Sequence, residues 1–154
     1  MGLFTPIAED ALFLLHSDPE EPLGTYSDHP FQLDDISWPT VMHYYQAMKF
    51  TDVNRVKKIQ QAPTVKQAIA LSKGFWLKPR ADWSQIKVTM MTRAVYTKLK
   101  TYPEIAEILL NTDNKPLVDT SHYDYFWGCG RDQRGHNHYG KMLMRIRDKL
   151  ADEH

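Results

Sequence analysis

Cysteine, long apolar runs and an excess of either charge are scarce or absent in this sequence. A single cysteine among 154 residues excludes an internal disulfide and is what a reducing compartment permits. No apolar run approaches the ~20 residues of a membrane-spanning helix. The acidic residues in the first segment, MGLFTPIAEDALFLLHS, do not fit a signal peptide. We therefore expect a cytoplasmic protein without a membrane partner.

The balance of charge excludes a second class of partner. Nineteen basic and nineteen acidic side chains cancel, which removes the usual charge argument for a nucleic-acid footprint and leaves open only a local basic patch. A hydrophobic content of 42% supports one sizeable core, and 154 residues are too few for two ordinary domains. We expect a single domain over residues 1–154.

The spacing of apolar residues and the positions of turn-forming residues predict a helix-rich α+β fold with a few short strands. Strands are expected within 11–17, 31–38 and 115–121, and the second range turns back on itself at Asp34-Asp35. The segment 122–140 is too rich in glycine and polar residues for regular structure. Helices are predicted over 40–50, 52–61, 65–73, 84–100, 103–111 and 137–150.

The helix that begins at Thr40 combines polar and sulfur side chains. Spacings of four and three residues place Met42, Gln46 and Lys49 on one face. A lysine on an otherwise apolar face has its pKa lowered by desolvation and becomes a nucleophile for a sugar carbon. The alternative is an ordinary lysine on a solvated face.

The segment before the last helix contains clustered glycines. Gly128 and Gly130 allow backbone to approach a ligand closely, and Asn137 is the expected N-cap of the following helix. A helix N-terminus offers N–H groups to a phosphate, so the segment is a candidate anion site. A plain tight turn is the alternative. The nearby HNH triplet (136–138) lacks a recognised ligand spacing, so we predict no metal site.

Aromatic side chains occur next to carboxylates at two places. Trp83 follows an aspartate, and Trp127 follows Asp119 and Asp124. Such groups can stack a planar base and assist its departure from a ribose through an oxocarbenium-like transition state. Large aromatic side chains are equally common in protein cores, so a purely structural role stays open.

Four motifs in order give the sequence a family resemblance. They are WPTVMHYYQAMKF (38–50), RADW (80–83), PLVDTSHYDYFWGCG (116–130) and GHNHYGKMLMRIR (135–147). Together they resemble the NADAR, or YbiA-like, family from about residue 20 to 150. The resemblance implies an N-glycosidase that hydrolyses the bond between a base-like amine and a ribose phosphate or ADP-ribose. Ribosylamine phosphates of early riboflavin synthesis and ADP-ribosylated guanine are the implied substrates, with no metal or redox cofactor.

The resemblance also implies roles for particular residues. In the family the motif lysine, here Lys49, attacks or pairs with the anomeric carbon of the ribose. The implied catalytic residues are Lys49, Asp119 and Asp124, and the implied substrate-binding residues are His43, Gln46, Trp83, Trp127, Gly128, Gly130 and Asn137.

Departures from the family pattern leave two functions open. Met42 replaces a family glutamate and can neither take nor give a proton, and Thr25, Asp119 and Tyr139 replace asparagine, glutamate and leucine. One hypothesis is a working N-glycosidase led by Lys49, with the proton supplied by Asp119, Asp124 or an acid within 18–35. The other is a catalytically impaired protein of the same fold that binds ADP-ribose-like nucleotides.

Overall fold

A computed structural model describes residues 7–153, which divide into two compact units. The central unit is Thr25–Thr101, and the terminal unit combines residues 7–24 with 102–153. Each unit has one two-stranded sheet. None of the helices within 7–153 is long and apolar enough to cross a membrane.

A β-hairpin forms one edge of the central unit. Strands β2 (Phe31–Leu33) and β3 (Ile36–Trp38) pair antiparallel. Asp34 and Asp35 connect them with φ of 57° and 62°, as a two-residue hairpin turn requires. The Trp38 side chain is fully buried, and its indole N–H donates to Leu33 O at 3.0 Å. The hairpin expected at this aspartate pair is therefore confirmed.

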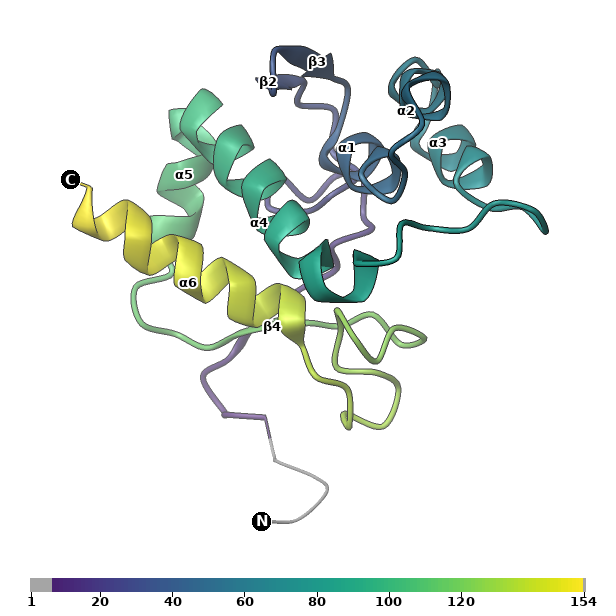
Figure 1. Ribbon diagram of the computed structural model, residues 1–154. Coiled ribbons are helices and arrows are strands. Elements are labelled where there is room, and N and C mark those ends of the chain that lie inside the picture. The colour runs from purple at the N-terminus through teal and green to yellow at the C-terminus, as the bar shows by residue number, and fades with distance from the viewer. Residues whose placement is uncertain (1–6, 154) are drawn as a thin grey trace. The chain divides into compact units, whose positions relative to one another are not determined.

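The centre of this unit is α1 (Val41–Ala47), whose seven residues are all buried. Figure 1 shows α1 beside α2 (Val53–Gln60) and α3 (Val65–Leu71), and it also packs against α4 (Trp83–Thr101). Thr40 caps α1 as predicted, because its hydroxyl accepts the His43 N–H at 3.1 Å.

Helix α1 ends at Ala47, earlier than the predicted Phe50. The next N–H groups bond to carbonyls three residues back, from Lys49 to Gln46 and from Phe50 to Ala47, so the chain tightens into a turn. The Lys49 carbonyl then accepts the Arg80 N–H at 2.7 Å. This distant contact, which sequence spacing cannot reveal, holds Lys49 just beyond the helix.

The terminal unit joins the two ends of the chain. Strand β1 (Leu12–Leu14) pairs parallel with β4 (Leu117–Asp119). Helix α6 (His138–Asp152) packs on β4, and α5 (Pro103–Leu110) packs on α6. The buried side of α6 supplies Met142, Leu143 and Ile146 to the core. Residues 122–137 form turns without regular structure, so the predicted elements and the α+β class are confirmed.

Candidate functional site

Lys49 is half-buried immediately after α1. Its Nζ atom lies 5.8 Å from the centroid of the Tyr45 ring. Burial lowers the pKa of Lys49, and the positive charges of Lys73 and Lys87 lower it further. Both effects increase the fraction of neutral amine, which is the nucleophilic form. The geometry therefore favours the desolvated lysine over the ordinary solvated one.

Gln46 and Met42 form a buried pair one turn apart on α1. The Gln46 side-chain Nε2 donates to Met42 Sδ at 3.1 Å, which fixes the direction of the amide. Gln46 Oε1 is buried and has no hydrogen-bond partner among the described residues. A buried acceptor without a donor costs free energy, about 1–3 kcal/mol, so this oxygen is suited to bind an N–H or O–H group.

His43 is buried, and both of its ring nitrogens bond to other groups of the protein. Its side chain is 1% exposed, Nδ1 pairs with Thr40 Oγ1 at 2.8 Å, and Nε2 pairs with Ala62 O at 3.0 Å. Burial lowers the pKa of His43, although the bond to Ala62 opposes that shift. Because both ring nitrogens have protein partners, the predicted substrate contact by His43 is not supported. The ring instead ties α1 to the segment after α2.

Trp83 begins α4 and packs beside the Lys49 region. Its ring lies 5.1 Å from that of Tyr45 at an interplanar angle of 58°. Trp83 is half-buried, so part of the indole remains available to a ligand. In the same motif Arg80 Nε donates to Asp82 Oδ1 at 2.6 Å. Within the central unit the structure thus brings Trp83 and Lys49 to the same tyrosine ring.

Asp119 is fully buried at the end of β4 in the terminal unit. Its Oδ1 accepts the Ser121 N–H at 2.9 Å and the Ser121 hydroxyl at 2.7 Å, and its Oδ2 pairs with Nδ1 of His16. The His16 ring stacks on Tyr139 with centroids 5.1 Å apart. Since both carboxylate oxygens are bound inside the unit, the geometry favours a structural role for Asp119 over the predicted proton transfer.

Asp124 and Trp127 belong to one turn. Asp124 Oδ1 accepts the N–H groups of Phe126 and Trp127 at 3.0 and 2.8 Å. Trp127 is 7% exposed, and its ring makes an edge contact with Phe126. The indole therefore fits the core interpretation rather than base stacking, and the carboxylate stabilises the turn that places it there.

The glycine segment does not form the predicted phosphate cradle. The N–H groups of Gly128 and Gly130 donate to the carbonyls of Asp124 and Ser121. A Cβ on Gly128 would lie 2.7 Å from Ser121 Cβ and 3.0 Å from Asp124 O. Gly130 has φ of +73°, and a Cβ there would meet the Tyr125 ring. Close packing of the chain on itself explains both glycines, which favours the alternative of a plain tight turn.

Asn137 also departs from its predicted role. It precedes α6 with left-handed backbone and no side-chain cap. Its amide instead pairs with β4, accepting from Asp119 N at 2.8 Å and donating to Leu117 O at 2.9 Å. The N–H groups of Asn137, His138 and Tyr139 donate to loop carbonyls. The start of α6 is therefore joined to the strand and the loop, and the predicted anion site there is not supported.

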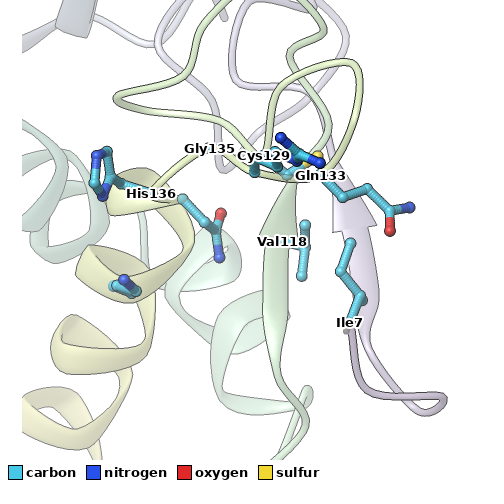
Figure 2. A pocket seen from close by; sticks show the side chains of 9 residues that line it. Ile7, Val118, Cys129, Gln133, Gly135 and His136 are labelled. Carbon is cyan, nitrogen blue, oxygen red and sulfur yellow. The ribbon is translucent and has the colours of Figure 1, made fainter. Parts of the chain in front are cut away.

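A pocket of about 410 Å³ lies in the terminal unit. Figure 2 shows Ile7 and Val118 near one another, with His136 on the opposite side. Of the predicted site residues, Asn137 lines it. Burial raises the pKa of the lining Cys129 thiol, which fits an unreactive cysteine. No group of three metal-binding side chains occurs within residues 7–153. The full lining is Ile7, Val118, Cys129, Gln133, Arg134, Gly135, His136, Asn137 and Lys141.

Two contributions were missed by sequence reasoning. Lys73 and Lys87 act on Lys49 from other elements, and His16 pairs with Asp119 across 103 residues of sequence. No local pattern encodes these contacts. The substitution at Tyr139 is explained by the fold, because its buried hydroxyl donates to Leu23 O at 2.6 Å.

These features define a class: a helix-rich α+β protein that presents a partly desolvated lysine beside a tyrosine ring, just after a helix that contains a buried glutamine amide. Comparison with known proteins identifies a family and several relatives. The NADAR domain matches residues 12–151. A Nostoc punctiforme protein named N-glycosidase is 39% identical over 86% of this chain and 88% of its own. The Zea mays chloroplastic riboflavin biosynthesis protein PYRR is 37% identical over 82% of this chain and 23% of its own.

A solved structure extends the comparison to the fold. The NMR structure of the Escherichia coli protein YbiA is similar with a TM-score of 0.85 and 26% identity, covering 99% of this chain and 95% of that one. The E. coli protein carries the name N-glycosidase YbiA. The chain belongs to the NADAR domain family.

Proposed function

We propose that this protein is an N-glycosidase that hydrolyses the bond between a base-like amine and the anomeric carbon of a ribose phosphate or ADP-ribose. The observation that carries the proposal is the environment of Lys49: half-buried, beside the Tyr45 ring, and with a pKa lowered by burial and by two other lysines. The names of the Nostoc and E. coli relatives support the same chemistry.

The neutral amine of Lys49 attacks C1 of the ribose. The C1–N bond breaks, and its electron pair leaves with the base. The attacking nitrogen becomes positively charged and gives one of its protons to the departing base, directly or through water. The ribose opens to an imine on Lys49, and one water molecule releases the sugar and restores the amine. This route proceeds without a carboxylate at position 42, although an acid there would speed it by protonating the leaving base.

Two neighbouring groups assist in this scheme. Gln46 Oε1, buried and without a partner among the described residues, accepts a hydrogen bond from the substrate and orients it. The accessible part of the Trp83 ring covers the base or ribose face. Lys73 and Lys87 keep the amine partly neutral and attract the substrate phosphate.

The test is chemical trapping. The protein is incubated with ADP-ribosylated guanosine, or with a ribosylamine phosphate of early riboflavin synthesis, in the presence of borohydride. Reduction of the imine adds the mass of the sugar to the peptide that contains Lys49. Lys49→Ala is expected to abolish the adduct and to slow base release by about a thousandfold or more. The matched control is Lys115→Ala, an exposed lysine of the terminal unit.

A second candidate rests on Met42. A thioether in place of the family glutamate removes a proton-transfer group, an effect of about a hundred- to ten-thousandfold in rate. The protein would then bind an ADP-ribose-like nucleotide without hydrolysing it. Calorimetry with ADP-ribose and base-release assays separate the two candidate functions. Binding heat without base release supports the nucleotide-binding protein, and base release that is lost in Lys49→Ala supports the N-glycosidase.

A further inference from the structure

The charge balance of the whole chain conceals a division between its two units. The central unit carries twelve basic and five acidic side chains, whereas the terminal unit carries seven basic and fourteen acidic ones. The central unit is therefore strongly positive although the protein is neutral. A positive unit attracts polyanions over about a Debye length at physiological salt.

The positive charge of the central unit is concentrated in one stretch of sequence. Residues 50–80, which include α2 and α3, contain one acidic residue, Asp52. Its carboxylate caps α2 by accepting the Asn54 N–H at 3.1 Å. Most of the basic side chains of this stretch are exposed. They are Arg55, Lys57, Lys58, Lys66, Lys73, Lys78 and Arg80.

Two aromatic side chains project from the loop between α3 and α4. Phe75 is 89% exposed and Trp76 is 88% exposed. Their rings meet edge to face, with centroids 4.9 Å apart and planes at 88°. Leaving an indole and a phenyl ring in water forgoes the gain that burial gives, about 1.5–3 kcal/mol for a phenyl side chain. The pair is better explained as a surface that becomes covered by a planar ligand.

A hollow of about 370 Å³ adjoins this pair. Trp76, Leu77 and Phe50 give it an apolar side, and Arg55, Lys78 and Arg80 add cationic groups. The rest of the lining is Thr51 and Asp52, whose carboxylate already caps α2. Arg55 Nη1 lies 3.4 Å from Leu71 O. An apolar surface next to several cations matches a ligand that has a planar ring and a phosphate in the same repeating unit.

We propose that this face of the central unit binds single-stranded nucleic acid. An unpaired base stacks on Trp76 beside Phe75, and the neighbouring phosphates contact Arg55, Lys78 and Arg80, which line the same hollow. Single strands are favoured over duplexes because a stacked base must be unpaired. An anionic membrane is less well matched, since α2 and α3 expose lysines rather than an apolar face that could enter lipid.

The test is fluorescence anisotropy with end-labelled oligothymidylate DNA and oligoadenylate RNA of about 12 nucleotides, a length within the usual site size. We expect binding at low salt that weakens as salt is raised, as counterion release requires. Trp76→Ala is expected to weaken binding roughly tenfold or more. Arg55→Gln with Lys78→Gln, two basic residues of the hollow, is expected to reduce the slope of log affinity against log salt by about 0.7 for each phosphate that these side chains neutralise in the wild-type complex.

Matched controls come from the acidic unit. Tyr123 is as exposed as Trp76, at 88%, and Arg145 is an exposed basic residue of α6. Tyr123→Ala and Arg145→Gln should leave oligonucleotide binding unchanged. Equal losses for Trp76→Ala and Tyr123→Ala, tighter binding of a duplex, or binding only to phosphatidylserine vesicles would each overturn the proposal. Binding does not depend on hydrolysis, so Lys49→Ala should retain it.

Discussion

Replacing Met42 by glutamate tests whether this chain lost a catalytic group. Met42 is 6% exposed, and its sulfur is a weak acceptor for Gln46 Nε2. A carboxylate at the position of the sulfur would accept the same N–H as a charge-assisted bond, which is roughly twice as strong. Lys49 lies just beyond the end of α1, two residues after Ala47.

The expected magnitude follows from the burial of the site. A carboxyl group that replaces a 6% exposed thioether loses most of its water, which raises its pKa toward neutrality and suits it to donate a proton to the leaving base. We therefore expect Met42→Glu to increase the base-release rate by about a hundred- to ten-thousandfold. The same burial should lower the stability of the protein by about 1–3 kcal/mol.

The assay is base release under single-turnover conditions, measured beside the thermal midpoint. Met42→Gln is the matched control, because it has the same shape and hydrogen-bonding reach as glutamate but no acidic proton to transfer. A large gain for Met42→Glu alone means that the wild-type chain is impaired. Equal rates for wild type, Met42→Glu and Met42→Gln would refute the reasoning and assign proton transfer to the lysine-led route.

Two further predictions concern charge and packing. Because only the neutral amine of Lys49 reacts and its pKa is lowered, the rate should rise with pH and level off below the ordinary lysine value of about 10.4. Lys73→Gln removes one repelling charge and should move this midpoint to higher pH by about half a unit or less, whereas an unmoved midpoint would contradict the electrostatic explanation. Gly128→Ala should cost about 1–3 kcal/mol by overpacking, seen as a lower thermal midpoint. In Gly74→Ala the new Cβ meets only the Leu77 side chain, at 3.1 Å or more, so the thermal midpoint should change little. A large decrease of the midpoint in Gly74→Ala would refute the packing explanation.

Local signals in the sequence account for most of the secondary structure. Thr40 and Thr64 are N-caps whose hydroxyls accept the N–H three residues on, and Asp34-Asp35 occupies the positive-φ positions of a hairpin turn. These features depend on neighbouring residues alone. The segment after the early end of α1 is instead held by the Arg80 bond to Lys49, a contact 31 positions away that no local pattern shows.

The candidate site was predicted less completely because residue type does not reveal which donors are already in use. Glycines 128 and 130 and Asn137 have the composition of an anion site, yet their N–H groups and the Asn137 amide bond to the chain itself. In the sequence Asp119 has the position of a catalytic acid, but its carboxylate is bound by His16, which lies 103 positions earlier. For Lys49 the sequence left a desolvated and a solvated amine open, and the helical spacing behind the first alternative does not reach Lys49, because α1 ends at Ala47.

The parallel pairing of β1 with β4 imposes an order on folding. Leu12 and its partner Leu117 are separated by most of the chain, so the terminal unit closes a long loop with a high entropy cost. The central unit consists of one continuous stretch, Thr25–Thr101, which is synthesised before β4. The local contacts of its helices can therefore form first, whereas β1 cannot pair until β4 has been synthesised.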